Sequence, residues 1–97
     1  MSKTEILNVL QPGKSYRVDA AKFAEMRRAV LAALPAVAPG ITPEALITAV
    51  KTALDPALFP GGEKAGWWVK AVQLDLEARG IVSRAEKPPV RLWKTSA

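Results

Sequence analysis

The chain has 97 residues, of which 49% are hydrophobic and 24% charged, and its formal net charge is +5. This length and composition predict one globular domain. Cysteine and histidine are both absent, which excludes disulfides, thiolate chemistry and metal sites built on thiols or imidazoles.

The first segment of interest is an apolar-leaning stretch at residues 4–10, which Pro12 and Gly13 bring to an end. Such a short run predicts one or two helical turns or a loosely packed arm. We therefore divide the chain into an N-terminal arm or short helix at 1–14 and a main domain at 15–95.

The next segments lead into an amphipathic helix. Residues 15–18 alternate apolar and polar side chains, which predicts a brief extended segment, and Asp19 then follows as a candidate N-cap. From 20 to 34 apolar side chains recur at steps of three and four residues, namely Phe23, Met26, Val30 and Leu34. This spacing predicts a helix that ends at Pro35.

Two further helices are predicted from their end signals. The Thr42-Pro43-Glu44 run supplies an N-cap, a first-turn proline and an acidic first turn, which predicts a helix at 43–54. A third helix is predicted at 65–79, with Gly80 in the position of a left-handed C-terminal cap. The connection at 55–66 is longer than the turn usual between the two helices of a helix-turn-helix.

After the third helix, residues 81–85 and 90–94 form two short β-prone runs separated by a loop of hairpin length. A register symmetric about that loop would place Arg84 opposite Arg91. Since two arginines facing each other repel, such a pair would favour a bound anion, for which a phosphate backbone is one source.

The segment WVKAVQLDLEARGIVSR at 68–84 resembles a small uncharacterised bacterial winged-helix family. The earlier segments FAEMRRAVL at 23–31 and GITPEAL at 40–46 also fit the pattern of that family. The resemblance implies an α+β fold, a winged helix with three main helices and a C-terminal two-stranded β-hairpin wing. It implies no catalytic residue and no known ligand.

Winged helices commonly present the third helix and the wing to nucleic acid. We therefore predict a domain that contacts duplex DNA through a basic wing with weak sequence specificity. Asp75 and Glu77 oppose DNA on the third helix, although Asp75 has the spacing of an i,i+4 pair with Arg79. The candidate DNA contacts are Lys64, Lys70, Gln73, Arg84, Lys87 and Arg91.

The alternative is a protein-interaction or homodimerisation module on the same scaffold, with Trp67 and Trp93 at its interface. The alternative for the basic residues is an ordinary solvated surface.

We do not expect an enzyme, because no serine has a histidine to activate it, and we expect no cofactor and no metal. The chain has no cysteines for disulfides and no signal-like segment, and its longest uncharged stretch is shorter than the ~20 residues of a membrane helix, so a cytoplasmic protein is expected.

Overall fold

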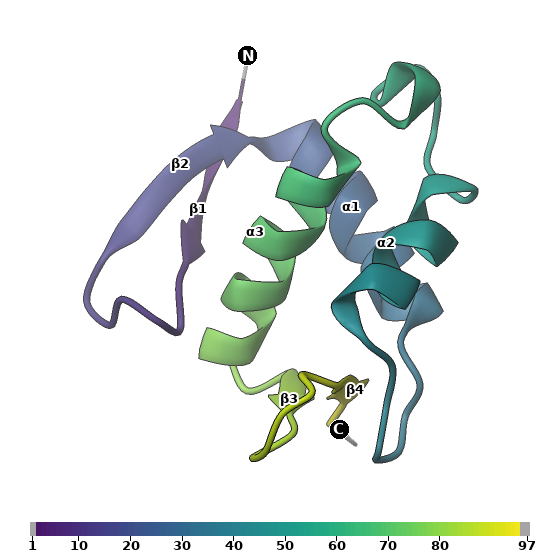
Figure 1. The fold of residues 1–97 in the computed structure, drawn as a ribbon. Coiled ribbons are helices and arrows are strands. Elements are labelled where there is room, and N and C mark those ends of the chain that lie inside the picture. The colour runs from purple at the N-terminus through teal and green to yellow at the C-terminus, as the bar shows by residue number, and fades with distance from the viewer. Residues whose placement is uncertain (1, 96–97) are drawn as a thin grey trace.

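The computed structural model describes residues 2–95 and has an α+β fold. Three helices lie between two separate antiparallel sheets, each of two strands (Figure 1). In chain order the elements are β1 Lys3–Leu7, β2 Ser15–Asp19, α1 Ala20–Ala33, α2 Pro43–Lys51, the 3-10 turn η1 Pro60–Gly62, α3 Ala65–Ala78, β3 Val82–Arg84 and β4 Leu92–Lys94.

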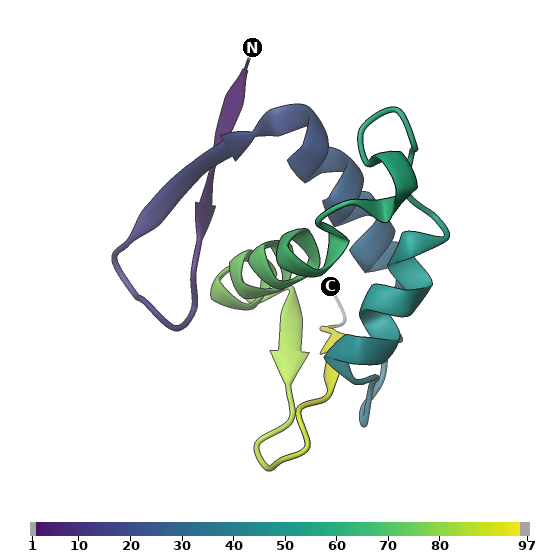
Figure 2. The ribbon, with the colours of Figure 1, turned by 45° about the horizontal axis from the view of Figure 1, so that its top comes forward.

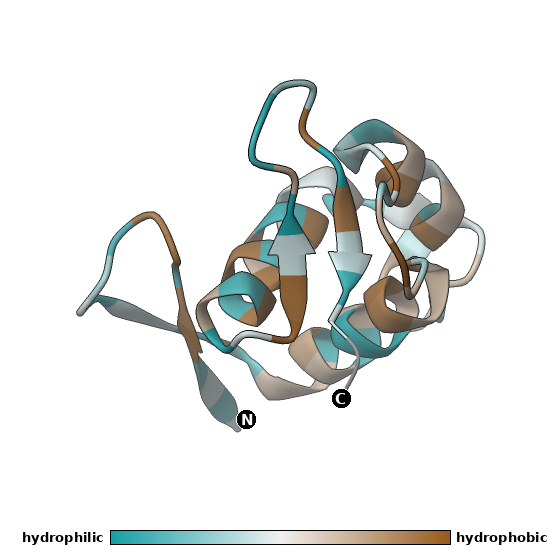
Figure 3. Ribbon diagram, turned by 90° about the horizontal axis from the view of Figure 1, so that it is seen from below, coloured by the Kyte–Doolittle hydropathy of each residue, from teal (hydrophilic) through white to brown (hydrophobic). Residues whose placement is uncertain are grey.

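The hydrophobic core lies where the three helices meet. Figure 3 shows the C-terminal strands β3 and β4 running alongside these helices, while the loop between the strands projects beyond them. Among the described residues, no helix combines the length and hydropathy needed to cross a bilayer. The core residues with almost no exposed surface are Met26, Val30, Leu46, Val50, Val69, Val72, Leu76 and Leu92.

The predicted starts of α1 and α2 are confirmed by their capping bonds. The Asp19 carboxylate accepts a hydrogen bond from the backbone N–H of Lys22 at 2.9 Å, which caps α1. The Thr42 hydroxyl accepts from the N–H of Ala45 at 3.2 Å and caps α2. In both cases a side-chain oxygen satisfies an amide that the first helical turn leaves without a partner.

The helix ends are less well predicted. α1 and α3 each end one residue before the prediction, but α2 ends at Lys51, three residues before the predicted 54. The N–H of Ala53 donates to the carbonyl of Val50 at 2.9 Å, which is a tighter turn than the α-helix makes. Pro56 restricts the residue before it to extended conformations, so the helix loosens ahead of that point.

The N-terminal segment corrects the prediction of a short helix at 4–10. Residues Lys3–Leu7 form β1, which pairs with β2 in an antiparallel ribbon. The two strands are joined by a turn in which Gly13 has a positive φ of 86°. A strand pairs the backbone hydrogen-bonding groups of this segment with β2 and also buries the side chain of Ile6. One or two isolated helical turns would do neither. The extended segment predicted at 15–18 is confirmed as β2.

The C-terminal hairpin occupies the predicted region, but the predicted register is wrong. Arg84 pairs with Leu92, so Arg84 and Arg91 are not cross-strand neighbours. The physical reason is that Val82 and Leu92 are both buried. Since a shift of one residue would turn one of them away from the core, burial selects the pairs Val82 with Lys94, Ser83 with Trp93 and Arg84 with Leu92.

A third segment pairs with β4. The N–H of Ile41 donates to the carbonyl of Leu92 at 2.9 Å, and the N–H of Leu92 donates back to the carbonyl of Ile41 at 2.8 Å. Gly40 has a positive φ of 78°, and a Cβ placed on it would lie 2.0 Å from the carbonyl oxygen of Leu92. The α1–α2 connection therefore needs glycine at this position to approach β4.

Candidate functional site

The third helix is more enclosed than the sequence predicted. The core covers one side of it, and the β1–β2 ribbon lies on another side (Figure 2). The N–H of Leu7 donates to Oδ1 of Asp75 at 2.8 Å, and the N–H of Val9 donates to the carbonyl of Leu74 at 3.3 Å. These two bonds hold the ribbon to the C-terminal half of α3. Over the whole helix the buried residues are Ala65, Trp68, Val69, Val72, Gln73, Leu74, Asp75 and Leu76.

Asp75 is the charged residue at the centre of this contact. Its side chain is fully buried, and it accepts hydrogen bonds from Nε of Arg79 at 3.0 Å as well as from the ribbon. The predicted i,i+4 pair between Asp75 and Arg79 is therefore confirmed. Nη2 of Arg79 also reaches the carbonyl of Glu5 at 3.4 Å. The carboxylate thus serves the ribbon and is not presented to an outside partner.

Gln73 does not lie on an outer face of α3, in contrast to the prediction. It is only 6% exposed, and its Nε2 donates to Oε2 of Glu77 at 3.1 Å. Glu77 also accepts two hydrogen bonds from Arg84, at 2.8 Å from Nε and 2.9 Å from Nη2. The prediction failed because the residues after α3 fold back beside it, which no helical spacing reveals.

The Glu77–Arg84 pair changes the expectation for the wing. Its hydrogen bonds raise the pKa of Arg84 above its ordinary value, and they occupy two of its guanidinium nitrogens. One of the two arginines predicted to attract an anion is therefore already neutralised within the domain. Arg91 is partly exposed, and Lys87 is exposed in the loop between the strands.

The remaining predicted residues lie on separate parts of the surface. Lys64 and Lys70 are exposed at the start and the middle of α3, and Trp67 lies between them with 59% of its surface exposed. Trp93 is partly buried on β4, which lies beyond the opposite end of α3 (Figure 1). The indole of Trp67 packs edge-to-face on Trp68 with ring centroids 5.2 Å apart. The two predicted interface tryptophans therefore do not form one seam.

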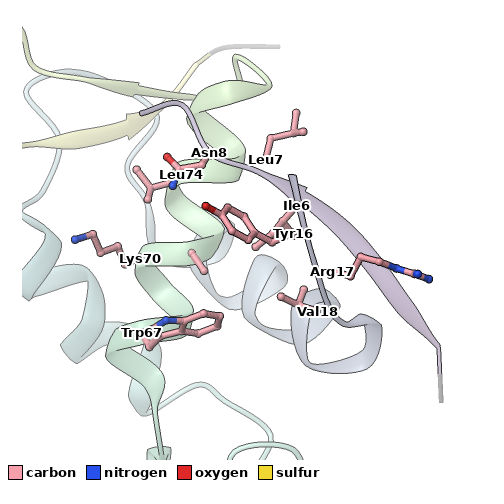
Figure 4. Close-up of a pocket in the computed structure, with 10 residues that line it drawn as sticks. Ile6, Leu7, Asn8, Tyr16, Arg17, Val18, Trp67, Lys70 and Leu74 are labelled. Carbon is pink, nitrogen blue, oxygen red and sulfur yellow. The ribbon is translucent and has the colours of Figure 1, made fainter. Parts of the chain in front are cut away.

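A hollow of about 530 Å³ separates the ribbon from the N-terminal half of α3. In Figure 4, Tyr16 extends from the ribbon towards α3 and Trp67 extends from the helix, whereas the Arg17 side chain points away from the hollow. The lining is mainly apolar, and it consists of Ile6, Leu7, Asn8, Tyr16, Arg17, Val18, Trp67, Lys70, Ala71 and Leu74.

A second hollow, of about 330 Å³, lies on the other side of the same helix ridge. Lys70 and Leu74 line both hollows, so the two form one continuous surface, which we call the α3 surface. No aspartate or glutamate lines either hollow. The second hollow is lined by Leu10, Pro43, Ile47, Gly66, Val69, Lys70, Gln73, Leu74, Arg84 and Val90.

The rim of the α3 surface exposes large apolar side chains. Leu10 is 62% exposed and Tyr16 is 46% exposed, and Val90 and Trp67 add to the same rim. Apolar side chains gathered in this way mark interaction surfaces on soluble proteins. The sequence analysis missed Leu10 and Tyr16 because their ribbon was not predicted, although a proline–glycine turn between two short apolar-containing runs is a hairpin signal.

These features describe a small α+β domain with an apolar and cationic helix face. A family model matches residues 3–92, and the chain belongs to that family, which is described as "Family of unknown function (DUF6958)". No curated protein and no solved structure was found to match the chain. Since the match begins within β1, the ribbon falls inside the region that the family model covers.

Proposed function

We propose that this domain is a winged-helix protein-interaction module, and that its α3 surface binds an acidic, apolar segment of a protein partner. The winged-helix assignment is supported by the order α1, the Ile41 bridge, α2, α3, β3 and β4, with Ile41 paired to β4 beside β3. The observation that carries the function is that the α3 surface exposes Trp67 from the helix and Leu10 and Val90 from the segments beside it.

The polar groups around α3 favour a protein over DNA. Base readout in the major groove requires side chains that are free to form hydrogen bonds with base edges. Gln73 and Arg84 both bond to Glu77 instead. Exposed apolar side chains can be buried against the apolar side chains of a protein partner, but they carry no charge with which to bind the phosphates of DNA.

The charges favour an acidic partner over a second copy of the chain. Lys70 borders both hollows, Lys64 is exposed on the same helix, and neither hollow has an acidic lining residue. Two copies meeting through this surface would bring like charges together, which is unfavourable. Sedimentation of the free protein should therefore show no association through this surface as concentration rises.

The experiment is selection of a random peptide library on the folded domain. The recovered peptides should combine aspartate or glutamate with large apolar residues, because these complement the lysines and the apolar rim. Recovery of basic or purely polar peptides would contradict the proposal, as would recovery of none. The chemistry of the selected sequences is therefore the readout.

Two substitutions locate the binding site. Trp67→Ala should weaken peptide binding at least about tenfold, as expected for an exposed aromatic anchor, and Lys70→Glu should do the same by charge repulsion. The matched controls are Val37→Ala, which truncates another exposed apolar residue, and Lys51→Glu, which reverses another exposed charge. Peptides that bind all four variants equally would show that the α3 surface is not the site.

Duplex DNA is the second candidate, and the observation that favours it is the set of exposed cations. Lys87 and Arg91 belong to the wing, and no salt bridge of the described residues involves them. A titration of amide shifts with a random duplex at low and moderate salt tests this candidate. Binding should weaken with salt at a log-log slope of about −0.9 per phosphate contact, and Lys87→Glu should reduce it.

A further inference from the structure

The two strands of the N-terminal ribbon differ in what their outer edges contact. The outer edge of β1 is occupied by α3, since the N–H of Leu7 bonds to Asp75 and the carbonyl of Glu5 accepts from Arg79. β2 lies on the other side of the ribbon (Figures 1 and 2). Its first three residues are exposed and its last two are partly buried.

The register shows which backbone groups of β2 point outward. The N–H of Ala20 donates to the carbonyl of Ser2 at 3.2 Å, which makes this a hydrogen-bonded pair in the register of the ribbon. Hydrogen-bonded and non-hydrogen-bonded pairs alternate along an antiparallel ladder. The backbone groups of Arg17 therefore point away from β1, just as the N–H of Leu7 on the other strand points away from β2 to reach Asp75.

The side chains of β2 lead towards the larger hollow. Tyr16 and Val18 line that hollow, with Trp67 across from them on α3 (Figure 4). Side chains alternate between the two faces of a strand. An added strand next to β2 would thus direct every second side chain to the face on which Tyr16 and Val18 lie, at the mouth of the apolar hollow.

The charges on β2 indicate what kind of strand would pair with it. Arg17 is at the middle of β2, and Lys14 directly precedes the strand; both are exposed, whereas the acid of the strand, Asp19, is partly buried and caps α1. Charged residues on an edge strand discourage pairing with an identical strand, whereas opposite charges across a strand pair are stabilising. The edge is therefore matched to an acidic strand and not to a second copy of β2.

We propose that β2 accepts an extended acidic segment of the partner as a third strand of the N-terminal sheet, with its alternate apolar side chains directed to the hollow between Tyr16 and Trp67. This inference rests on the proposed function and specifies the conformation of the bound segment. Strand addition of this kind gains affinity from backbone hydrogen bonds and specificity from alternate side chains.

The test is amide hydrogen exchange of the intact domain, with and without the acidic peptides recovered from the library. A second probe is a synthetic peptide in which glutamate alternates with valine. In the free domain the N–H of Arg17 should exchange readily, because it faces solvent, while the N–H of Val18 is slowed by its bond within the ribbon. Bound peptide should slow exchange at Arg17 about tenfold or more.

Two variants separate the backbone of Arg17 from its charge. Arg17→Pro removes the outward N–H without breaking the ribbon ladder, since proline is tolerated at an edge position whose amide makes no ladder bond. Arg17→Ala removes the charge but keeps the amide. Strand addition predicts that the proline variant binds peptide several-fold more weakly than the alanine variant, with unchanged circular dichroism for both. If the proline variant unfolds, the test is the change in hydrogen exchange at Arg17 of the unmodified domain when peptide binds.

The failure of this inference differs from the failure of the proposed function. Acidic peptides that depend on Trp67 and Lys70 but leave exchange at Arg17 unchanged would overturn strand addition alone. A library that yields no acidic peptide would overturn both. Equal binding of a control peptide with lysine in place of glutamate would contradict the charge argument, and with it the choice of an acidic strand.

Discussion

The two hairpins of this domain differ in how they are held. The β1–β2 ribbon has five cross-strand pairs, but half of its strand residues are exposed. The β3–β4 hairpin has only three pairs, yet Val82 and Leu92 are buried in the core. Because Val82 and Leu92 belong to the central core, we expect the β3–β4 hairpin to be the more firmly held of the two, although its strands are shorter.

Both hairpins are also fastened to α3 by carboxylates that are two residues apart. Asp75 accepts from the N–H of Leu7 in the ribbon, whereas Glu77 accepts from Arg84 in β3. Residues two apart on a helix point in different directions, so neighbouring positions can serve opposite sides of the same helix. The sequence analysis treated these two acids only as groups on the third helix that oppose DNA.

The largest expected effect comes from breaking the core contact of the C-terminal hairpin. Leu92→Ala removes a side chain with no exposed surface, so it should lower the free energy of unfolding by about 3 kcal/mol. Urea denaturation followed by tryptophan fluorescence measures the loss. Val37→Ala, at an exposed position, is the control and should change little. A loss of Leu92→Ala close to that control would contradict the role assigned to this hairpin.

Asp75→Asn should act on the other hairpin. It replaces the buried carboxylate with a neutral group of similar shape, which weakens the bonds to Arg79 and to the ribbon and should cost about 2 kcal/mol. Hydrogen exchange should accelerate at Leu7 and Val9 before it does at β3. Uniform acceleration across the domain would instead mean that the ribbon and the core unfold together.

Glu77→Gln is the matched change on the side of α3 that faces β3. It should release Arg84, whose side chain is one third exposed, so the expected loss is smaller, about 1 kcal/mol. Exchange should accelerate at Ser83 and Ala85, whose amides face β4 in this register, while the ribbon amides stay unchanged. An equal effect on both hairpins would show that the two carboxylates do not divide their roles as the hydrogen bonds indicate.

The smallest effect should come from acid acting on a carboxylate outside both hairpins. Hydrogen bonding to Arg28 lowers the pKa of Glu25 from 4.5 to about 2, and the N–H of Asp55 contributes in the same direction while burial opposes both. Because the folded pKa is depressed, the stabilisation is present above the unfolded pKa and is lost as pH falls from 4.5 towards 2. Glu25→Gln should remove that part of the pH dependence in thermal denaturation measured from pH 5 to pH 2. It should leave the hydrogen exchange rates of both hairpins unchanged.

The sequence was sufficient for the elements whose signals are local. Asp19, Thr42 and Pro43 mark helix starts through contacts within one turn, and the spacing of apolar residues gave the buried side of α1. The register of β3 with β4 could not be read in the same way. It depends on Val82 and Leu92 sharing one core, which is a property of the assembled domain.

The candidate site was only partly predictable for the same reason. Lys70 and Trp67 are exposed on α3, as a contact role requires, but Gln73 is buried beside residues of distant segments such as Leu10 and Arg84. The ribbon that lines half of the α3 surface depends on a pairing between two short segments that are weak signals individually. Such non-local pairing leaves little periodicity in either segment.

The contact between Gly40 and Leu92 has a consequence for how the domain is made. During synthesis the connection between the first two helices is exposed long before β4 is available, because Leu92 is translated much later than Ile41. Until β4 has been synthesised, the core of the nascent helices lacks the Leu92 side chain. We therefore expect the domain to complete its folding only after β4 is available. The synthesis of β4, and not the formation of the helices, should set the moment at which the domain becomes resistant to proteases.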